Sequence, residues 1–274
     1  MITFPNCKIN LGLNILQKRA DGFHNLETVF YPLAFNDVLE VVSTDKQTEF
    51  INTGIPGGEK EKNLCLKAYT LLKKHYPHLP EIKMHLHKTI PVGAGLGGGS
   101  SDAAFTLTIL NEKFNLNISI EQLFEYASQL GSDCPFFLLN SPCFATGVGE
   151  RLTKLDLSLS RYKILLINPG IHISTKELFS KITPSIPAKS IKEIILQPIE
   201  SWKNEMENDF EPIVFSMFGE IKKLKESLYQ QNAIYASMTG TGSSVYGIFN
   251  ANDQINFPFD KRYFYKWISL GQFL

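Results

Sequence analysis

The stretch Pro91-Val92-Gly93-Ala94-Gly95-Leu96-Gly97-Gly98-Gly99-Ser100-Ser101 decides how the rest of the chain is interpreted. Glycine dominates it, and glycine loses more conformational entropy on folding than any other residue. Such a density indicates backbone with positive φ, or a ligand that presses close to the main chain. A simple tight turn between a strand and a helix needs far fewer glycines. We therefore interpret the stretch as a ligand-binding loop.

A helix is predicted directly after this stretch, beginning near Ser101, because apolar residues recur at helical spacing over 103–114. The first turn of a helix offers unpaired N–H groups and the positive end of the helix dipole. A glycine-rich turn in front of it makes an anion site, for which phosphate is the usual ligand. The hydroxyls of Ser100 and Ser101 could cap the helix, or contact phosphate oxygens and a metal-bound water.

Three well-known phosphate loops fit this stretch poorly. The P-loop pattern requires a lysine after its second glycine, but Gly99 follows Gly98. The chain has no HRD or DFG segment of a protein kinase. Gly93, Gly95 and Gly98 match the dinucleotide fingerprint, yet no acidic residue ends a second strand about 20 residues later. The region 113–122 reads as a loop and a helix start instead.

The N-terminal strand over 8–15 places two polar side chains together. Apolar and polar residues alternate there, which is the pattern of a half-buried strand. Its polar face carries Lys8 and Asn10, about 7 Å apart along the strand. Lys8 alone would more often be a solvated surface residue.

The remaining patterns predict an α+β fold, because strands and helices alternate irregularly rather than as a βαβ series. Asn63 is a candidate N-cap for a helix over 64–75, and Ser119 with Gln122 forms a candidate capping box for a helix that ends at Leu130 before Gly131. Asp133 follows in a short loop before Pro135. The further predicted elements are strands at about 37–42, 82–87, 162–168 and 245–249, a loop at 183–189, helices within 190–231 and a second glycine cluster at 238–245.

Composition narrows the classes of function. The 274 residues include 27 Lys plus Arg and 27 Asp plus Glu, so broad electrostatic capture of nucleic acid or of an anionic membrane is not expected. The four cysteines (Cys7, Cys65, Cys134 and Cys143) are scattered and predicted to be free thiols. The N-terminus does not have the pattern of a signal peptide, and no apolar run reaches membrane-spanning length. A cytoplasmic protein is expected.

The motifs together resemble one family. Residues 91–101 are similar to the ATP-binding motif of the GHMP kinases. Within that family, the subfamily that phosphorylates 4-diphosphocytidyl-2-C-methyl-D-erythritol is the most similar. The other matching motifs are Lys8-Ile-Asn10-Leu-Gly-Leu, Arg19-Ala-Asp21-Gly-Phe-His24, Gly131-Ser-Asp133-Cys-Pro135-Phe-Phe, Asn208-Asp209-Phe210-Glu211 and Gly240-Thr-Gly242-Ser.

The resemblance implies a two-domain GHMP kinase fold with its active site in the cleft between the domains, an ATP-binding N-terminal domain over 1–155 and a C-terminal domain over 156–274. It implies phosphoryl transfer from ATP, with Mg²⁺, to the substrate's 2-hydroxyl in the non-mevalonate isoprenoid precursor pathway. Its metal ligands and the oligomeric state stay open. The implied site residues are Lys8 and Asp133 as the catalytic pair, 91–101 around the triphosphate, and Asn10, Phe23, His24, Thr175, Gly240, Thr241 and Gly242 on the substrate side.

The chemistry of the residues agrees with this implication. Phosphoryl transfer to an alcohol needs charge around the moving phosphoryl group and a carboxylate that accepts the hydroxyl proton. Lys8 and Asp133 could supply both, and an adjacent ammonium would lower the pKa of Asp133. Without the phosphate site, Asp133 would more often be a helix N-cap. Asp102 stays outside the candidate site, because it would repel a bare triphosphate unless it faced away or shared a magnesium ion.

Phe23 and His24 follow Asp21-Gly22, a dipeptide that favours a tight turn, so both side chains are expected to project from a loop. Many relatives have Tyr where this chain has Phe23, so stacking on cytosine is kept while a hydroxyl hydrogen bond is lost. Phe23 could instead anchor the core. Two rival functions are another GHMP kinase, such as a homoserine or mevalonate kinase, and a nucleotide-binding regulator without catalysis.

Overall fold

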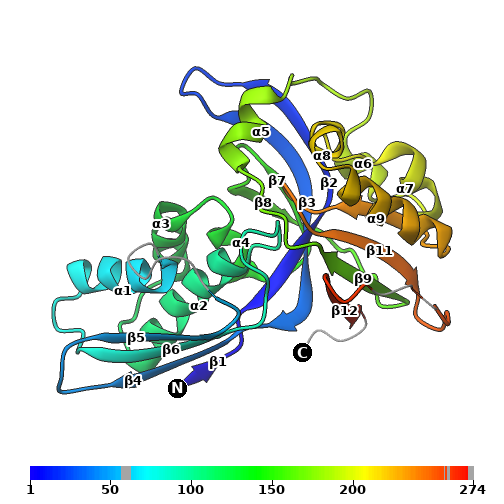
Figure 1. The fold of residues 1–274 in the computed structure, drawn as a ribbon. Coiled ribbons are helices and arrows are strands. Elements are labelled where there is room, and N and C mark those ends of the chain that lie inside the picture. The colour runs from blue at the N-terminus through cyan, green and yellow to red at the C-terminus, as the bar shows by residue number, and fades with distance from the viewer. Residues whose placement is uncertain (57–62, 256, 258–259, 271–274) are drawn as a thin grey trace. The chain divides into compact units, whose positions relative to one another are not determined.

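The computed structural model describes residues 1–56, 63–255, 257 and 260–270, and it divides into two compact units. The first unit contains residues 1–7, 35–92 and 97–141, and the second contains 8–34, 93–96 and 142–274. Both units are assembled from separate stretches of chain, so they do not coincide with the halves 1–155 and 156–274. Each unit combines helices with sheets, which confirms the α+β prediction (Figure 1).

In its described residues, the first unit has one sheet in the strand order β1-β4-β6-β5 and four helices. β4 pairs antiparallel with β1 and β6, whereas β5 pairs parallel with β6. Figure 1 shows α1 and α2 over one face of this sheet. Its elements are β1 (Ile2–Thr3), β4 (Val38–Ser43), β5 (Glu49–Gly54), α1 (Leu64–His75), β6 (Ile82–Lys88), α2 (Gly98–Lys113), α3 (Ile120–Leu130) and α4 (Cys134–Leu139).

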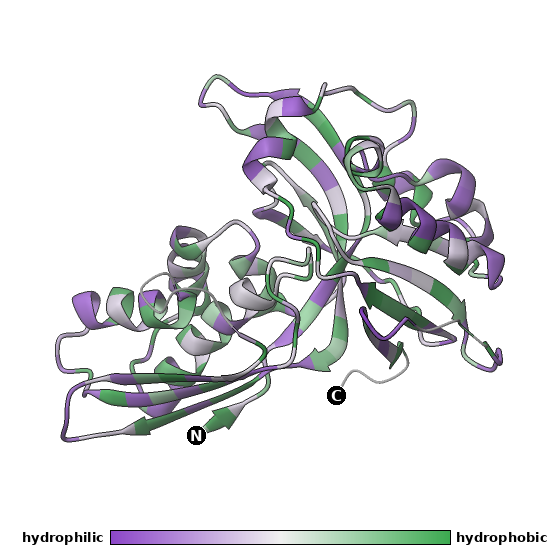
Figure 2. Cartoon of the chain, viewed as in Figure 1, coloured by the Kyte–Doolittle hydropathy of each residue, from purple (hydrophilic) through white to green (hydrophobic). Residues whose placement is uncertain are grey.

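Alternation along β4 and β6 builds the core of the first unit. Leu39 and Val41 on β4 and Met84 and Leu86 on β6 are buried against the helices. Figure 2 shows the resulting change between green and purple along these strands. On α1, Asn63 caps the N-terminus by accepting from the Cys65 N–H at 2.9 Å, as the sequence predicts.

Where the structure describes the second unit, it contains two sheets, in the orders β2-β3-β7-β8 and β10-β11-β9-β12, and five helices. Its core includes buried residues of β9 and β11 and the apolar face of α9, which carries Ile221, Leu224 and Leu228. Its elements are β2 (Asn6–Lys18), β3 (His24–Asn36), β7 (Cys143–Thr146), β8 (Arg151–Lys154), β9 (Tyr162–Asn168), α5 (Thr175–Lys181), α6 (Ile191–Ile194), α7 (Ile199–Glu205), α8 (Glu211–Met217), α9 (Gly219–Gln230), β10 (Tyr235–Met238), β11 (Val245–Asn250) and β12 (Phe264–Ser269). β2 and β3 begin or end within the first unit.

Two local expectations are wrong. The helix after the glycine-rich stretch begins at Gly98 rather than near Ser101, because Gly97 at φ +70° ends the turn and acts as the N-cap. The strand over 8–15 is not half-buried: both of its faces are covered, and residues 6–15 are all buried. The pattern showed alternation, but it could not show that the polar face is also packed against protein.

Candidate active site

The start of α2 follows a glycine turn and has the features expected of an anion site. The Ser101 N–H donates to the Gly97 carbonyl at 2.9 Å, which closes the first helical turn and leaves the earlier N–H groups without helical partners. Gly99 is exposed there and Ser100 is half-buried, whereas the Ser101 hydroxyl is buried without a hydrogen-bond partner. This turn offers N–H groups, a positive dipole end and hydroxyls to an anion.

Residues 93–96, the middle of the glycine-rich stretch, belong to the second unit and are held there by the second glycine turn. Gly95 has φ +77°, and a Cβ at this position would lie 2.0 Å from the Thr239 carbonyl oxygen. The Thr239 hydroxyl donates to the Gly95 carbonyl at 3.0 Å. Gly95 is therefore required by the close approach of the protein's own backbone rather than of a ligand.

Lys8 and Asn10 lie on β2 in a buried polar network. Each side chain is only 3% exposed, and Lys8 Nζ donates to Asn10 Oδ1 at 2.6 Å and to the Gly95 carbonyl at 3.3 Å. Lys8 Nζ also lies 4.9 Å from the centre of the Phe30 ring. A buried lysine needs such partners, because removing an ammonium from water is costly. A solvated surface role for Lys8 is excluded.

The turn Gly240-Thr241-Gly242 is fixed by Asn208, a residue to which the sequence analysis assigned no role. Asn208 Nδ2 donates to the carbonyls of Met238 at 3.0 Å and Gly240 at 2.9 Å. Thr241 and Thr175, both predicted on the substrate side, lie together with their hydroxyl oxygens 3.0 Å apart. The motif that contains Asn208 was the available signal, but its supporting role depends on contacts that the sequence does not show.

Glu211, from the same motif, supports the strand before this turn. Its carboxylate accepts from the Met238 N–H at 2.7 Å and from the Ser237 hydroxyl at 3.1 Å. Lys225 pairs with it from α9. The carboxylate is 6% exposed and satisfied by these donors, so it holds the turn in place rather than facing a ligand.

Phe23 and His24 are adjacent in the chain but differ in burial. Phe23 is 63% exposed, and its N–H donates to Asp21 Oδ1 at 3.1 Å, which confirms a turn and excludes a core role for the ring. His24 begins β3 and is 6% exposed, with its ring 5.2 Å from that of Phe179. Burial, and secondly the charge of Lys18, lower the pKa of His24. The expectation that both side chains project from a loop is wrong for His24, because His24 is already the first residue of β3, a strand that the sequence patterns did not indicate.

Asp133 occupies the N-cap position of α4, yet its side chain makes no capping hydrogen bond. The carboxyl group is half-buried in the first unit. Cys134, the next residue, is buried, which raises the pKa of its thiol to about 12, while a hydrogen bond with Ser100 acts in the opposite direction. The capping role that an isolated aspartate would have is therefore not the one Asp133 plays.

The predicted site residues are divided between the units. Pro91, Val92, Gly97–Ser101 and Asp133 belong to the first unit, and Lys8, Asn10, Phe23, His24, Thr175 and Gly240–Gly242 belong to the second. Within the second unit the network of Lys8, Asn10, Gly95 and Thr239 is brought together by direct contacts. Phe23 takes no part in those contacts.

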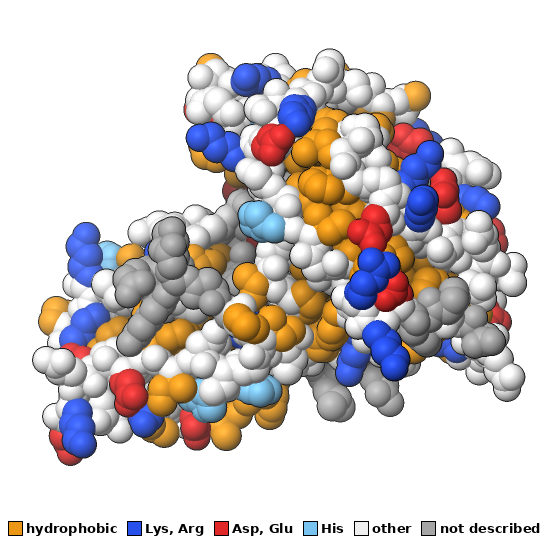
Figure 3. Space-filling model, viewed as in Figure 1, with side chains coloured by type: hydrophobic (Ala, Val, Ile, Leu, Met, Phe, Trp, Pro, Cys, Tyr) orange, Lys and Arg blue, Asp and Glu red, His pale blue; other side chains and the backbone are white. Residues whose placement is uncertain are grey.

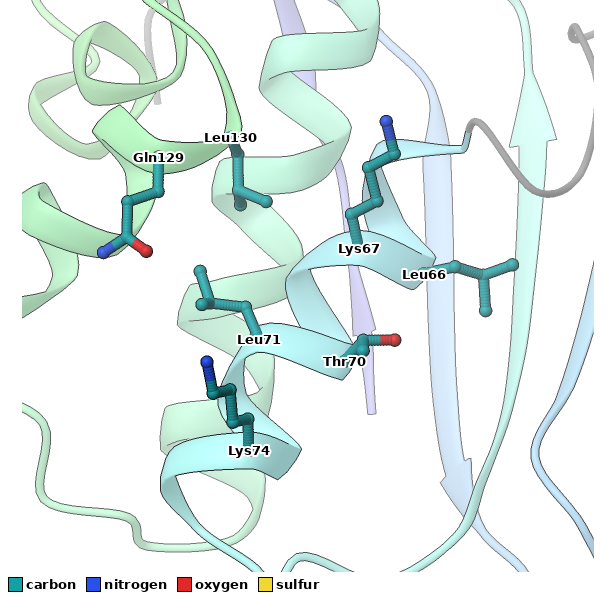
Figure 4. Close-up of a pocket in the computed structure, with 7 residues that line it drawn as sticks. All are labelled: Leu66, Lys67, Thr70, Leu71, Lys74, Gln129 and Leu130. Atoms are coloured by element: carbon teal, nitrogen blue, oxygen red, sulfur yellow. The ribbon is translucent and has the colours of Figure 1, made fainter.

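A separate hollow of about 530 Å³ lies between α1 and α3 (Figure 4). None of the predicted site residues lines it. Figure 4 shows Lys67 and Lys74 along α1, with Leu71 facing Leu130 between them. Its lining residues are Leu66, Lys67, Thr70, Leu71, Lys74, Gln129 and Leu130.

Among the described residues, no three His, Cys, Asp or Glu side chains are grouped so that they could hold a metal ion by themselves. The four cysteines are buried, and none of them is in a disulfide. None of the helices in the described part of the chain combines the length and apolar character that crossing a bilayer requires.

Two family models match the chain. The model described as GHMP kinases N terminal domain matches residues 63–141, and the one described as GHMP kinases C terminal matches residues 190–257. The first match contains the start of α2 and Asp133, and the second contains the turn 240–242.

Curated relatives and solved structures point the same way. The chain is 54% identical over 251 residues to a 4-diphosphocytidyl-2-C-methyl-D-erythritol kinase of Azobacteroides pseudotrichonymphae, covering 91% of this chain and 93% of the relative. It is 51% identical over 259 residues to the protein of that name in Bacteroides fragilis, covering 93% and 94%. A crystal structure of 4-(cytidine 5'-diphospho)-2C-methyl-D-erythritol kinase is 31% identical with a TM-score of 0.78, covering 90% and 89%. A homoserine kinase from Cytophaga hutchinsonii, 13% identical with a TM-score of 0.67 over 97% and 96% of the two chains, shares the fold.

Proposed function

The chain belongs to the GHMP kinases, and we propose that it transfers the γ-phosphoryl group of ATP to the 2-hydroxyl of 4-diphosphocytidyl-2-C-methyl-D-erythritol. The proposal is carried by sequence identity. Over nine-tenths of its length, more than half of the chain's residues are identical to those of curated relatives whose names state this activity. The reaction would place the enzyme in the non-mevalonate pathway to isoprenoid precursors.

The stretch Pro91–Ser101 is proposed to hold the triphosphate. Backbone N–H groups at the start of α2 would contact phosphate oxygens, and the helix dipole would favour their charge. Mg²⁺ would neutralise charge that develops during transfer. The unpartnered Ser101 hydroxyl and the neighbouring Ser100 are oxygen donors of the kind this ion prefers, and Mg²⁺ usually needs few protein ligands beside phosphate and water.

Asp133 and Lys8 are proposed as the catalytic pair. The Asp133 carboxylate accepts the proton of the 2-hydroxyl, the hydroxyl oxygen forms a bond to the γ-phosphorus, and the bond to the leaving ADP oxygen breaks. The Lys8 ammonium orients the hydroxyl and offsets charge on the transferred group. Asn10 keeps Lys8 in position through the 2.6 Å hydrogen bond.

The substrate side is proposed to include Asn10, Phe23, His24, Thr175 and the turn Gly240-Thr241-Gly242. The exposed ring of Phe23 is available to stack on cytosine, and the paired hydroxyls of Thr175 and Thr241 are available to the sugar alcohol or its diphosphate. His24 packs on Phe179, so its contribution would come from one edge of an already fixed ring.

We further propose that the enzyme acts in the cytoplasm on small molecules alone. Four buried cysteines that form no disulfide suit a reducing compartment. On the face shown in Figure 3, basic and acidic side chains are interspersed among the described residues, in keeping with the net charge of zero. Such a surface favours neither nucleic acid nor an anionic membrane.

ATP turnover tests the proposal and separates its rivals. ADP release should be rapid with the diphosphocytidyl alcohol and slow without it. Rapid release with homoserine or mevalonate instead would assign another reaction of the family. Tight ATP binding without turnover on any alcohol would indicate a regulator.

A further inference from the structure

Asp37, Lys88 and Asp102 form a buried charged cluster in the first unit that the proposed reaction does not use. Their exposed fractions are 0%, 5% and 3%. Lys88 Nζ donates to Asp102 Oδ2 at 2.7 Å and also to the Asp37 carboxylate. Buried charges are tolerated only when they are paired and hydrogen-bonded, so the lysine is what allows two carboxylates to occupy this interior.

The cluster connects the two ends of the glycine-rich stretch. Lys88 is the last residue of β6, and Asp37 Oδ1 accepts from the next two N–H groups, of Thr89 at 2.6 Å and Ile90 at 2.9 Å. Asp102 lies near the start of α2, on the other side of the stretch. The chain thus leaves the cluster at Ile90, passes through the glycines and returns to it within α2.

The space around Gly98 shows how closely Lys88 approaches the start of α2. A Cβ added to Gly98 would lie 3.3 Å from Lys88 Nζ and 3.0 Å from Ile90 Cγ2. Both contacts are tighter than ordinary packing, so a side chain at this first helical position would push against the lysine or Ile90. The lysine therefore lies directly against the turn whose N–H groups would face phosphate.

We propose that this cluster is a clasp for nucleotide binding, in which Lys88 is a positioning residue that joins Asp37 and Asp102 and thereby fixes both ends of the loop. The inference rests on the proposed function, because phosphate is the ligand of the positioned N–H groups. A loop of glycines has many accessible conformations, and tying its ends reduces the entropy lost when it orders around a ligand.

The electrostatics of the cluster fit this role. Burial raises the pKa of Asp102, while the charge of Lys88 acts in the opposite direction and Asp37 adds to the rise. The thiol of Cys65, on α1, also faces these three groups, and burial raises the pKa of this thiol. Asp102 thus faces inward, where its carboxylate accepts from Lys88, and it is not directed at a triphosphate.

A charge-matched double variant tests the clasp by calorimetric ATP binding and by steady-state kinetics. Lys88→Met with Asp102→Asn keeps the net charge of the ionised cluster and removes the bridge. We expect its Kd and KM for ATP to rise about tenfold or more, with kcat and the KM of the alcohol changed by less than threefold. Asp102→Asn alone keeps an oxygen that accepts from Lys88, so its ATP affinity should stay close to that of the wild type.

Leu123→Ala, which opens a cavity in the core of the same unit, is the control for lost stability. It should lower the melting temperature without a selective change in ATP affinity. If charge alone set ATP affinity, Asp102→Asn would tighten binding and the double variant would match the wild type, which would overturn the clasp. Parallel changes in kcat and in both KM values would also overturn it.

Asp37→Asn perturbs the cluster less than the double variant does, so it serves as the test if the double variant does not fold. It should weaken ATP binding in the same direction by a smaller factor, and unchanged ATP affinity in this folded variant would contradict the clasp. The calorimetric arm needs no alcohol, so it decides the clasp even if the wild type fails to phosphorylate the diphosphocytidyl substrate. That failure would contradict the proposed function alone.

Discussion

The two units offer different chemistry to a ligand. The first unit offers main-chain N–H groups at the start of α2, and its charged side chains there are directed inward, toward each other. The second unit offers side chains. These are a lysine on β2 that is hydrogen-bonded to an asparagine side chain, two threonine hydroxyls near the turn 240–242, and the exposed aromatic ring of Phe23. Backbone N–H groups suit phosphate, whose recognition needs no side-chain identity, whereas side chains suit a structured organic substrate.

This difference predicts which kinetic constant each variant should change. Substitutions at the start of α2 should act on ATP, and substitutions around the turn at Phe23 should act on the alcohol. The proposed catalytic pair takes Asp133 from the first unit and Lys8 from the second, so substitutions of these two residues should act on kcat instead.

The largest effect is expected for Asp133→Asn. It keeps the shape and removes the proton acceptor, so kcat should fall about 10²–10⁴-fold while the KM for ATP changes little. The melting temperature of the variant, measured alongside, separates the loss of the proton acceptor from a loss of folded protein. Lys8→Met should lower kcat similarly, and the double variant should lose much less than the product of the two effects. Near-normal turnover of folded Asp133→Asn would exclude it as the base.

Phe23→Ala should give the next largest effect, on the alcohol alone. Loss of stacking on a base is worth about 1–3 kcal/mol in nucleic-acid sites, which corresponds to a rise in KM of roughly 5–150-fold. Because the ring is 63% exposed, stability and ATP affinity should be nearly unchanged. Phe23→Tyr should be neutral or improve binding. Phe4, 58% exposed in the first unit, offers a matched control, because Phe4→Ala should alter neither KM. Equal effects of the two alanine variants would remove the stacking assignment.

Gly99→Val should weaken ATP binding by about tenfold or more, or 1.4 kcal/mol, and leave the alcohol unaffected. Gly99 is a cleaner test than Gly97, whose φ of +70° would add backbone strain to any substitution. Among the described residues, a Cβ at Gly99 would come within 4 Å of Leu64 Cδ1 alone, at 3.9 Å, so the new methyl groups would occupy the space assigned to phosphate. Gly219→Val, at the first position of α9, is the control for valine in a first helical turn, because no described residue lies within 4 Å of a Cβ added there. Unchanged ATP affinity in calorimetry would argue against a phosphate site at this turn.

The smallest effect concerns His24 and pH. Its pKa is lowered in the folded protein, so below the unfolded value of 6.5 the unfolded state binds more protons and stability falls as the pH falls. His24→Gln removes this contribution. Denaturant unfolding at pH 7 and pH 5 should therefore show a smaller loss of stability on acidification for the variant than for the wild type. An equal loss in both proteins would show that His24 is not a source of acid sensitivity.

Local elements could be predicted where short-range spacing determines them. The helix over 64–75 and the strand over 162–168 have the predicted bounds, since a helical or apolar run and its flanking residues carry the necessary information. Strand β3 was missed, and its absence from the prediction misplaced His24. A long strand buried against protein on both faces lacks the alternation that makes a strand visible in sequence.

The motifs at 91–101, 21–24 and 131–135 are enough to identify the family and to name the residue types at which phosphate chemistry is expected. The contacts that these residues make follow from the folded chain. The Asn10 N–H donates to the hydroxyl of Thr239, which lies 229 positions away, and the Lys88 ammonium donates to the carboxylate of Asp37, at a separation of 51. Spacing patterns report which residues share a face of one strand or helix, whereas burial of Lys8, the close approach at Gly95 and the clasp depend on which elements pack together. Those contacts arise from closing the whole chain around its cores, and no short window of sequence contains them.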